Sequence, residues 1–157
     1  MTGTATLSRR ALGALVVLSV SGLSTVSSLA GPEIYTGTLS SLAADGYDVV
    51  AFHTEGRPVR GDSRFTHRWK NATWRFASAA ARDAFAAAPE RYAPAYGGHC
   101  AWAAAQGYRA AGDPRHWHIV AGRLYLNYDA RVHRTWLTDV PGFIAAADSK
   151  WPTLAAR

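Results

Sequence analysis

The sequence contains a single cysteine, Cys100, among 157 residues, and this scarcity excludes several kinds of site. One thiol cannot form a disulfide within the chain, and a redox cycle between two cysteines of one chain is excluded as well. Cys-x-x-Cys, haem-attachment and multi-cysteine zinc motifs are absent from the sequence. The thiol is therefore free, bridged to another chain, or a metal ligand.

Other chemical motifs are also absent from the sequence. It has no Gly-x-Ser-x-Gly motif, no P-loop and no dinucleotide fingerprint, which favours a protein without enzymatic activity. The formal net charge is +6, but after residue 30 no two Lys or Arg residues are adjacent. Nucleic-acid binding requires a concentrated basic patch, so we expect no nucleic-acid partner.

Residues 1–30 are typical of an export signal. Arg9 and Arg10 precede a short apolar run, residues 11–20, and the small residues 28–30 fit a cleavage site. The run is shorter than the roughly 20 residues that span a bilayer, so we expect no stable membrane span after cleavage; an uncleaved anchor is the alternative. The paired arginines fit a general secretory or a twin-arginine signal, and both predict a periplasmic or extracellular protein.

The remainder of the chain is predicted to form one α+β domain: a small antiparallel sheet of hairpins packed by short helices. The expected order is an N-terminal arm (31–45), the domain (46–152) and a C-terminal tail (153–157). Within it we expect a strand at 46–53, hairpins at 65–76 and 116–126, and helices at 79–88, 99–106, 129–139 and 141–149. No internal repeat is evident.

The segment 92–102 is the first candidate for chemistry. Gly97 and Gly98 allow a sharp turn, and Cys100 is expected in the first turn of the following helix, where the backbone favours a thiolate. His99 could add positive charge or a nitrogen ligand. The competing interpretation is that Cys100 is a buried, inert side chain, as free cysteines often are.

The histidines give a second, weaker signal. His116 and His118 are two residues apart in a predicted strand and therefore share one face, which suits metal chelation by two imidazoles. Two partly exposed strand histidines are the alternative. His53, His67 and His133 occur singly, and we interpret them as surface or packing residues.

Several short motifs, taken together, resemble the exported YHS-domain proteins, a subgroup that includes selenoprotein forms. They are Tyr47-Asp48-Val49-Val50-Ala51-Phe52, Trp74-Arg75-Phe76-Ala77-Ser78, Pro89-Glu90-Arg91-Tyr92-Ala93-Pro94, Tyr96-Gly97-Gly98-His99-Cys100-Ala101, Gly112-Asp113-Pro114, Leu124-Tyr125-Leu126-Asn127-Tyr128 and Trp151-Pro152. The resemblance covers nearly all of residues 31–157. It implies a compact antiparallel sheet packed by helices, and a distant relationship to the metal-binding YHS and TRASH domains.

The sequence departs from the metal-binding relatives at their ligands. Where the resemblance implies three cysteines, this chain has Ala51, Ala77 and Ala81. Alanine has no donor atom, so the three-thiolate site cannot form. The resemblance also implies that the selenium residue of selenoprotein forms aligns with Cys100, a position that then requires a soft, reactive atom.

Three functional hypotheses follow. In the first, the protein is an exported, non-enzymatic YHS-type module that binds copper or another soft metal ion through Cys100, with His99 and, more weakly, His116 and His118 as further ligands. In the second, Cys100 is the nucleophile of a thiol redox protein and an external thiol resolves it. In the third, the domain is structural or binds a partner protein, and Cys100 is inert.

Overall fold

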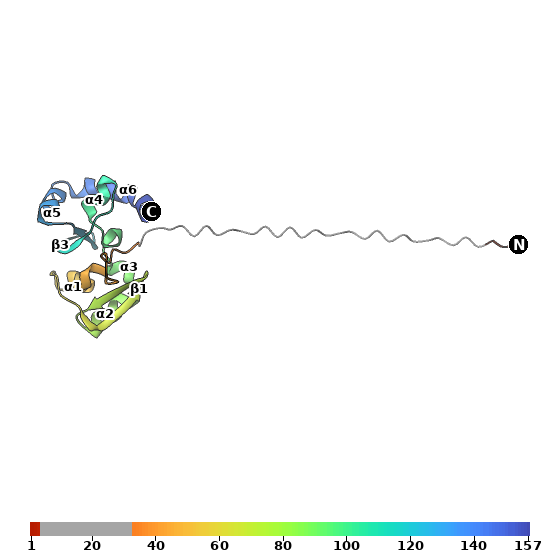
Figure 1. Ribbon diagram of the computed structural model, residues 1–157, viewed down its shortest axis with the longest axis horizontal. Helices are drawn as coiled ribbons and strands as arrows, with labels where there is room; N and C mark the ends of the chain where they lie inside the picture. Colours follow the sequence, from red (N-terminus) through yellow and green to blue (C-terminus); the bar gives the residue numbers. More distant parts are fainter. Residues whose placement is uncertain (4–32) are drawn as a thin grey trace.

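Two antiparallel β-hairpins frame the protein in the computed structural model, which describes residues 1–3 and 33–157 (Figure 1). The first half contains η1 (Ala43–Gly46), α1 (Val49–Thr54), β1 (Asp62–Trp69), β2 (Ala72–Phe76), α2 (Ala79–Ala87) and α3 (Pro89–Tyr92). The second half contains η2 (Ala95–Gly98), α4 (Ala101–Gln106), β3 (Asp113–Val120), β4 (Arg123–Asn127), α5 (Ala130–Trp136) and α6 (Val140–Ala155). The predicted α+β class, with hairpins packed by short helices in a single domain, is confirmed.

The two halves repeat one local architecture: a 3-10 helix, a short α-helix, a hairpin and a further helix. Asp62 pairs with Phe76 in the first hairpin, and the residues 51 positions later, Asp113 and Asn127, pair in the second. Both hairpins also have an irregular register directly after that first pair. The expectation that the chain has no internal repeat is therefore wrong at the level of structure.

The hairpin turns repeat as well. Lys70 and Asn71 have φ angles of 48° and 60°, and Ala121 and Gly122 have φ angles of 49° and 76°. Two consecutive left-handed residues make the tight turn whose twist matches that of the flanking strands. The turn positions were predicted correctly, although only Asn71 and Gly122 are residue types that favour this conformation.

The second hairpin joins the halves because both of its faces are buried. Leu124 and Leu126 of β4 pack into the core of the first half, whereas Tyr125 packs against Trp136 of the second. Between the halves, the ring of Phe52 lies 5.1 Å from that of Trp117. Each fully buried leucine contributes roughly 1.5–3 kcal/mol to stability, which is enough to hold the halves together as one domain.

The first predicted strand is wrong: residues 49–54 form helix α1. The β-branched residues Val49 and Val50 favour a strand, but Asp48 overrides this preference as the N-cap. Its Oδ1 accepts hydrogen bonds from the Val50 and Ala51 amides at 2.9 and 3.3 Å. Phe52 is then buried on the helix face that meets the core.

The last helix is longer than predicted. Proline removes a backbone donor and was expected to end the helix, yet α6 continues through Pro152. Packing on both sides of the proline compensates for the lost hydrogen bond, because Trp151 packs edge-on against the ring of Tyr96 and Leu154 is buried. The elements from 79 to 136 otherwise follow the predicted order.

The predicted export signal at 1–30 lies outside the described residues apart from its first three. The described part of the predicted arm is anchored: Ile34 is buried in the first core, and the Tyr35 amide donates to the Gly97 carbonyl at 2.8 Å. Among the described residues, no helix is long and apolar enough to cross a membrane.

Candidate functional site

Cys100 is 1% exposed and is the N-cap residue of α4, directly before the helix rather than within its first turn as predicted, because the helix begins at Ala101 and not at His99. The chain reaches it through Gly98, whose φ of 84° lies in the left-handed region that favours glycine. The Cys100 amide donates to the Ala110 carbonyl at 2.9 Å, and the residue bridges to Leu126 of β4. Gly112 permits this approach, since a Cβ there would lie 2.3 Å from the Gly98 carbonyl oxygen. The surrounding backbone therefore fixes the position of the thiol.

Three backbone amides near the sulfur favour its ionised form. The amides of Ala103, Tyr128 and Trp102 each lower the thiol pKa. The neutral thiol, by contrast, makes no capping hydrogen bond within the described part of the chain. These amides therefore form a small anion-binding nest, whose stabilisation is realised as negative charge develops on Sγ.

The first half shows what such a nest holds when its occupant is charged. Asp48 is the equivalent N-cap of α1 and is 1% exposed. Besides its two capping bonds, its Oδ2 accepts from the Ala77 amide at 2.8 Å. The amides of residues 50, 51 and 77 correspond to those of 102, 103 and 128 around Cys100. The same backbone arrangement thus binds a carboxylate in one half and a thiol in the other.

Burial of the Cys100 thiol raises its pKa, and this effect is larger than the lowering by the backbone amides. It raises the pKa of the Cys100 thiol above its ordinary value, with a smaller contribution in the same direction from Asp129. The lowered pKa expected from a helix N-terminus is therefore wrong. The short helix and its three amides do not outweigh the removal of the thiolate from water, and the resting thiol is protonated at neutral pH.

Asn127, at the end of β4, completes the surroundings of the thiol. Asn127 is 0% exposed. Its Oδ1 accepts a hydrogen bond from the Trp102 amide at 3.3 Å and a weak one from the Cys100 thiol, whose Sγ lies 3.8 Å away. Its Nδ2 is buried and has no partner among the described residues. An unpaired buried donor costs about 1–3 kcal/mol, so this amide is an unused binding group beside Cys100.

A cavity of about 220 Å³ opens beside Cys100. Aromatic and aliphatic side chains form most of its wall, and Arg131 of α5 is the one cation that lines it. Within the described part of the chain, the Arg131 guanidinium has no carboxylate partner. The lining residues are Cys100, Trp102, Ala103, Tyr108, Ala110, Tyr128, Arg131 and Val132.

The first half has an equivalent cavity of about 360 Å³, beside Asp48. Six lining positions correspond in the two cavities: Asp48 with Cys100, Val50 with Trp102, Ala51 with Ala103, Ala77 with Tyr128, Ala80 with Arg131, and Ala81 with Val132. Ala51, Ala77 and Ala81, the positions where the family resemblance implies metal thiolates, therefore line one cavity although they come from separate elements. Cys100 corresponds to Asp48 and to none of those three positions.

His99 does not join Cys100. Adjacent side chains on extended backbone point in opposite directions, and the His99 ring packs 5.5 Å from both Tyr35 and Trp151. Cys100 instead packs with Ala103 and Val132. His99 is thus part of the aromatic packing between the N-terminal arm and α6.

His116 and His118 lie on one face of β3, as predicted, but they meet a third histidine rather than Cys100. The ring of His133, on α5, lies 6.5 Å from that of His116 and 6.2 Å from that of His118. Burial and the two neighbouring imidazoles lower the pKa of His133. Among the described residues, no group of three His, Cys, Asp or Glu side chains is placed to hold a metal ion.

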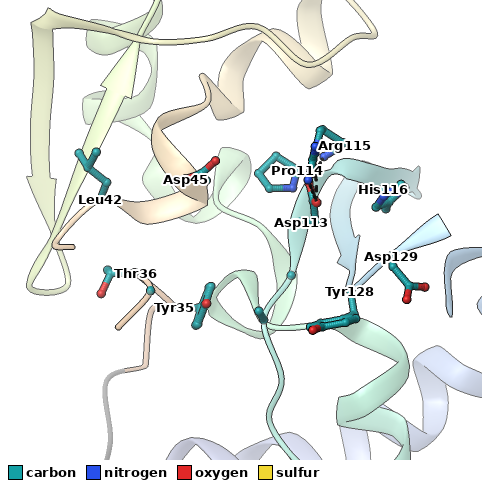
Figure 2. A pocket seen from close by; sticks show the side chains of 13 residues that line it. Tyr35, Thr36, Leu42, Asp45, Asp113, Pro114, Arg115, His116, Tyr128 and Asp129 are labelled. Atoms are coloured by element: carbon teal, nitrogen blue, oxygen red, sulfur yellow. Dashed lines mark hydrogen bonds and ion pairs between the residues drawn. The ribbon is translucent and has the colours of Figure 1, made fainter. Parts of the chain in front are cut away.

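A larger open cavity, about 450 Å³, lies where the N-terminal arm, η1 and the start of β3 meet (Figure 2). Its carboxylates already have partners. Asp113 binds Arg115 through both oxygens, as the dashed lines in Figure 2 show, and Asp45 binds Arg60. Asp129 caps α5 through the Val132 amide at 2.7 Å. This cavity therefore offers less unused binding capacity than the one at Cys100.

Sequence reasoning missed Asn127, Arg131 and His133 as neighbours of the candidate residues. Asn127 had a detectable signal, since an amide ending the apolar run 124–127 must find a partner when buried. Arg131 and His133 had none, because only the packing of α5 against the second hairpin brings them to the cavity and to β3.

Comparisons with known proteins provide no further assignment. A scan against protein-family models, a search of curated proteins and a search of solved structures each returned no match to this chain.

Proposed function

We propose that this protein is an exported module of the YHS type in which the Cys100 thiol acts as a single-cysteine redox centre. The observation that carries the proposal is the position of Sγ beside a cavity, in the backbone nest that binds a carboxylate in the other half. A nest that holds an anion lowers the energy of a thiolate as it forms. A cysteine that served only to fill the core, or that stayed a neutral thiol, would not require amide donors around its sulfur.

The chemistry needs one external oxidant and two equivalents of an external thiol. Cys100 loses its proton to solvent, and the thiolate attacks a peroxide: an S–O bond forms, the O–O bond breaks and hydroxide leaves with the electron pair. An external thiol then attacks the sulfenic sulfur, a mixed disulfide forms and water leaves. A second external thiol attacks the external sulfur of the mixed disulfide: an external disulfide forms, the bond to Cys100 breaks and reduced Cys100 is released.

The raised pKa gives this centre a specific character. At neutral pH only a small fraction of the thiol is ionised, so reaction with general oxidants is slow. Reaction accelerates for a reagent that enters the cavity and develops charge at the nest. The centre is therefore selective rather than generally reactive.

The proposal is tested by treating the purified protein with hydrogen peroxide in the presence of dimedone, which traps sulfenic acid, and following intact mass. We expect one dimedone adduct on the folded protein and none on Cys100→Ser. In parallel, iodoacetamide alkylation against pH reports the thiol pKa, which we expect above the ordinary value of about 8.5.

The structural alternative predicts different kinetics. If Cys100 is only a packing residue, modification will proceed no faster than global unfolding, and its rate will reach a plateau at the unfolding rate as reagent concentration rises. An unfolding rate measured by denaturant jump under the same conditions provides the comparison. That outcome would remove the redox proposal and leave a structural or partner-binding domain.

Binding of copper or another soft metal ion through Cys100 stays a prediction. The nest suits a metal-bound thiolate equally well, but His99, His116 and His118 pack in other clusters. A metal at Cys100 would therefore need a ligand from a partner molecule. Titration with Cu(I) of the wild type and Cys100→Ser, with stoichiometry by mass spectrometry, separates one metal per two chains from no binding.

A further inference from the structure

The cavity beside Cys100 combines aromatic and aliphatic side chains with one guanidinium that has no carboxylate partner among the described residues. Trp102 and Tyr108 meet edge to face, with ring centroids 6.4 Å apart, and Tyr128 is 56% exposed at the same cavity. Ala103, Ala110 and Val132 supply aliphatic surface. Aromatic walls favour a planar, apolar body, since stacked or edge-on rings gain attraction beyond burial alone.

Charge then selects among such molecules. Arg131 lines the cavity and has no carboxylate partner among the described residues. A guanidinium binds carboxylates through two parallel hydrogen bonds, so it favours an anionic group at the cavity mouth. The fully buried Asn127 does not line the cavity, although its Oδ1 lies 3.8 Å from Sγ, so the charge preference of the cavity depends on Arg131.

Size sets a third limit. Pockets for drug-sized ligands are about 300–1,000 Å³, so a cavity of about 220 Å³ admits a smaller molecule or one half of a symmetrical one. In the first half, Ala80 and Val50 replace Arg131 and Trp102, so that cavity offers neither the cation nor the indole. The ligand-selecting features are confined to the half that carries the thiol.

We infer that this cavity binds small aromatic anions and that Cys100 exchanges with aryl disulfides that carry a carboxylate. The inference rests on the proposed redox function and names its substrate class. The Cys100 thiolate attacks one sulfur of the aryl disulfide: a mixed disulfide forms, the aryl S–S bond breaks and an arenethiolate leaves with the electron pair. Cys100 is oxidised, the released aryl thiol is reduced, and the proton of Cys100 passes to solvent.

The test compares three disulfides on the folded full chain under pseudo-first-order conditions. The probes are 5,5′-dithiobis(2-nitrobenzoate), which is aromatic and anionic, 2,2′-dithiodipyridine, which is aromatic and neutral, and cystamine, which is aliphatic and cationic. Each rate is divided by the rate of the same probe with the urea-unfolded chain. We expect this ratio to be highest for the anionic aryl disulfide and lowest for cystamine.

Arg131→Gln isolates the contribution of the charge, and Arg134→Gln is its matched control. Arg134 lies one turn further along α5, is exposed and does not line the cavity. Its substitution therefore removes the same net charge without changing the cavity. We expect Arg131→Gln to slow the anionic probe about 1.5–5-fold while leaving the neutral probe unchanged, the range expected for a solvent-exposed ion pair. Arg134→Gln should change neither rate, and Arg131→Lys should retain most of the preference.

The outcomes distinguish the two proposals. If the folded chain reacts with no probe faster than it unfolds, both the redox function and this inference are overturned. If all three probes react with equal ratios, or if Arg131→Gln and Arg134→Gln slow the anionic probe equally, the redox function stands and the substrate class is wrong.

Discussion

Cys100 and Asp48 occupy equivalent positions in the two halves of the protein, each as the N-cap of a six-residue helix and each facing three corresponding backbone amides. The Asp48 carboxylate accepts from all three of its amides, whereas the neutral thiol is a weak acceptor and the Trp102 amide donates to Asn127 Oδ1 instead. One half therefore uses the arrangement for stability, and the other keeps it available for a charge that forms during reaction.

The first prediction follows from this difference. Asp48→Ala leaves three buried or half-buried amides without an acceptor, and we expect it to lower the free energy of unfolding by about 2–4 kcal/mol. Cys100→Ala removes only a weak acceptor and a small buried volume, and should cost about 1 kcal/mol. Urea denaturation of both variants provides the measurement. Equal losses would show that the two nests are not energetically distinct.

Asn127→Asp tests the electrostatics at the thiol. A carboxylate beside Sγ disfavours a second negative charge, so we expect the thiol pKa to rise further and alkylation at a fixed pH to slow. The iodoacetamide rate against pH is the readout, and a circular dichroism spectrum matching the wild type establishes that the variant is folded. A thiol pKa that stays unchanged would mean that Asn127 is not electrostatically coupled to Cys100.

The sequence predicted those elements whose ends carry local signals. Ser78 caps α2 by accepting from the Ala81 amide, and Gly107 ends α4 in the left-handed conformation, both as expected. The strand prediction for 46–53 is wrong because the hydrogen bonds that Asp48 accepts, one of them from the Ala77 amide 29 residues away, outweigh the strand preference of two valines. Long-range hydrogen bonds of this kind leave no periodic signal in the sequence.

The candidate site divides in the same way. Cys100 was found because it is the only cysteine, and the resemblance singled out Ala51, Ala77 and Ala81, which the structure places around one cavity. The repeat that relates the two cavities was not found, because corresponding residues keep their backbone roles while changing in chemistry. Asp48 against Cys100 and Ala80 against Arg131 show no similarity at the level of residue type.

Stability is expected to depend on pH through His133. Burial and the neighbouring His118 and His116 lower its pKa in the folded state below the ordinary value of about 6.5. Above that pH both folded and unfolded chains are neutral at this position, and stability is fully present. As the pH falls below about 6.5, the unfolded chain binds a proton that the folded chain does not, and stability is lost until the folded pKa is passed.

Urea unfolding between pH 8 and pH 5 measures this effect. We expect His133→Gln to reduce the slope of the unfolding free energy against pH by at most the slope that the uptake of one proton on unfolding produces. His53 contributes in the same direction, because burial lowers its pKa too, so His53→Gln is measured separately. A slope that His133→Gln leaves unaltered would place the pH dependence elsewhere.

The last prediction concerns the proposed relationship to metal-binding YHS domains. Ala51, Ala77 and Ala81 line a single cavity although they lie on α1, directly after β2 and on α2. If that cavity descends from a three-thiolate site, cysteines at these positions should converge on one ion. We expect Ala51→Cys, Ala77→Cys and Ala81→Cys together, in a Cys100→Ser background, to bind one Zn²⁺ or Co²⁺ per chain.

Cobalt provides the readout, through its thiolate charge-transfer and d–d absorption bands. The control is the variant with cysteine only at positions 51 and 77, which should bind far more weakly because one thiolate is missing. Equal binding by the two variants, or none by either, would count against the relationship, since it would mean that the three positions do not share a metal-binding geometry.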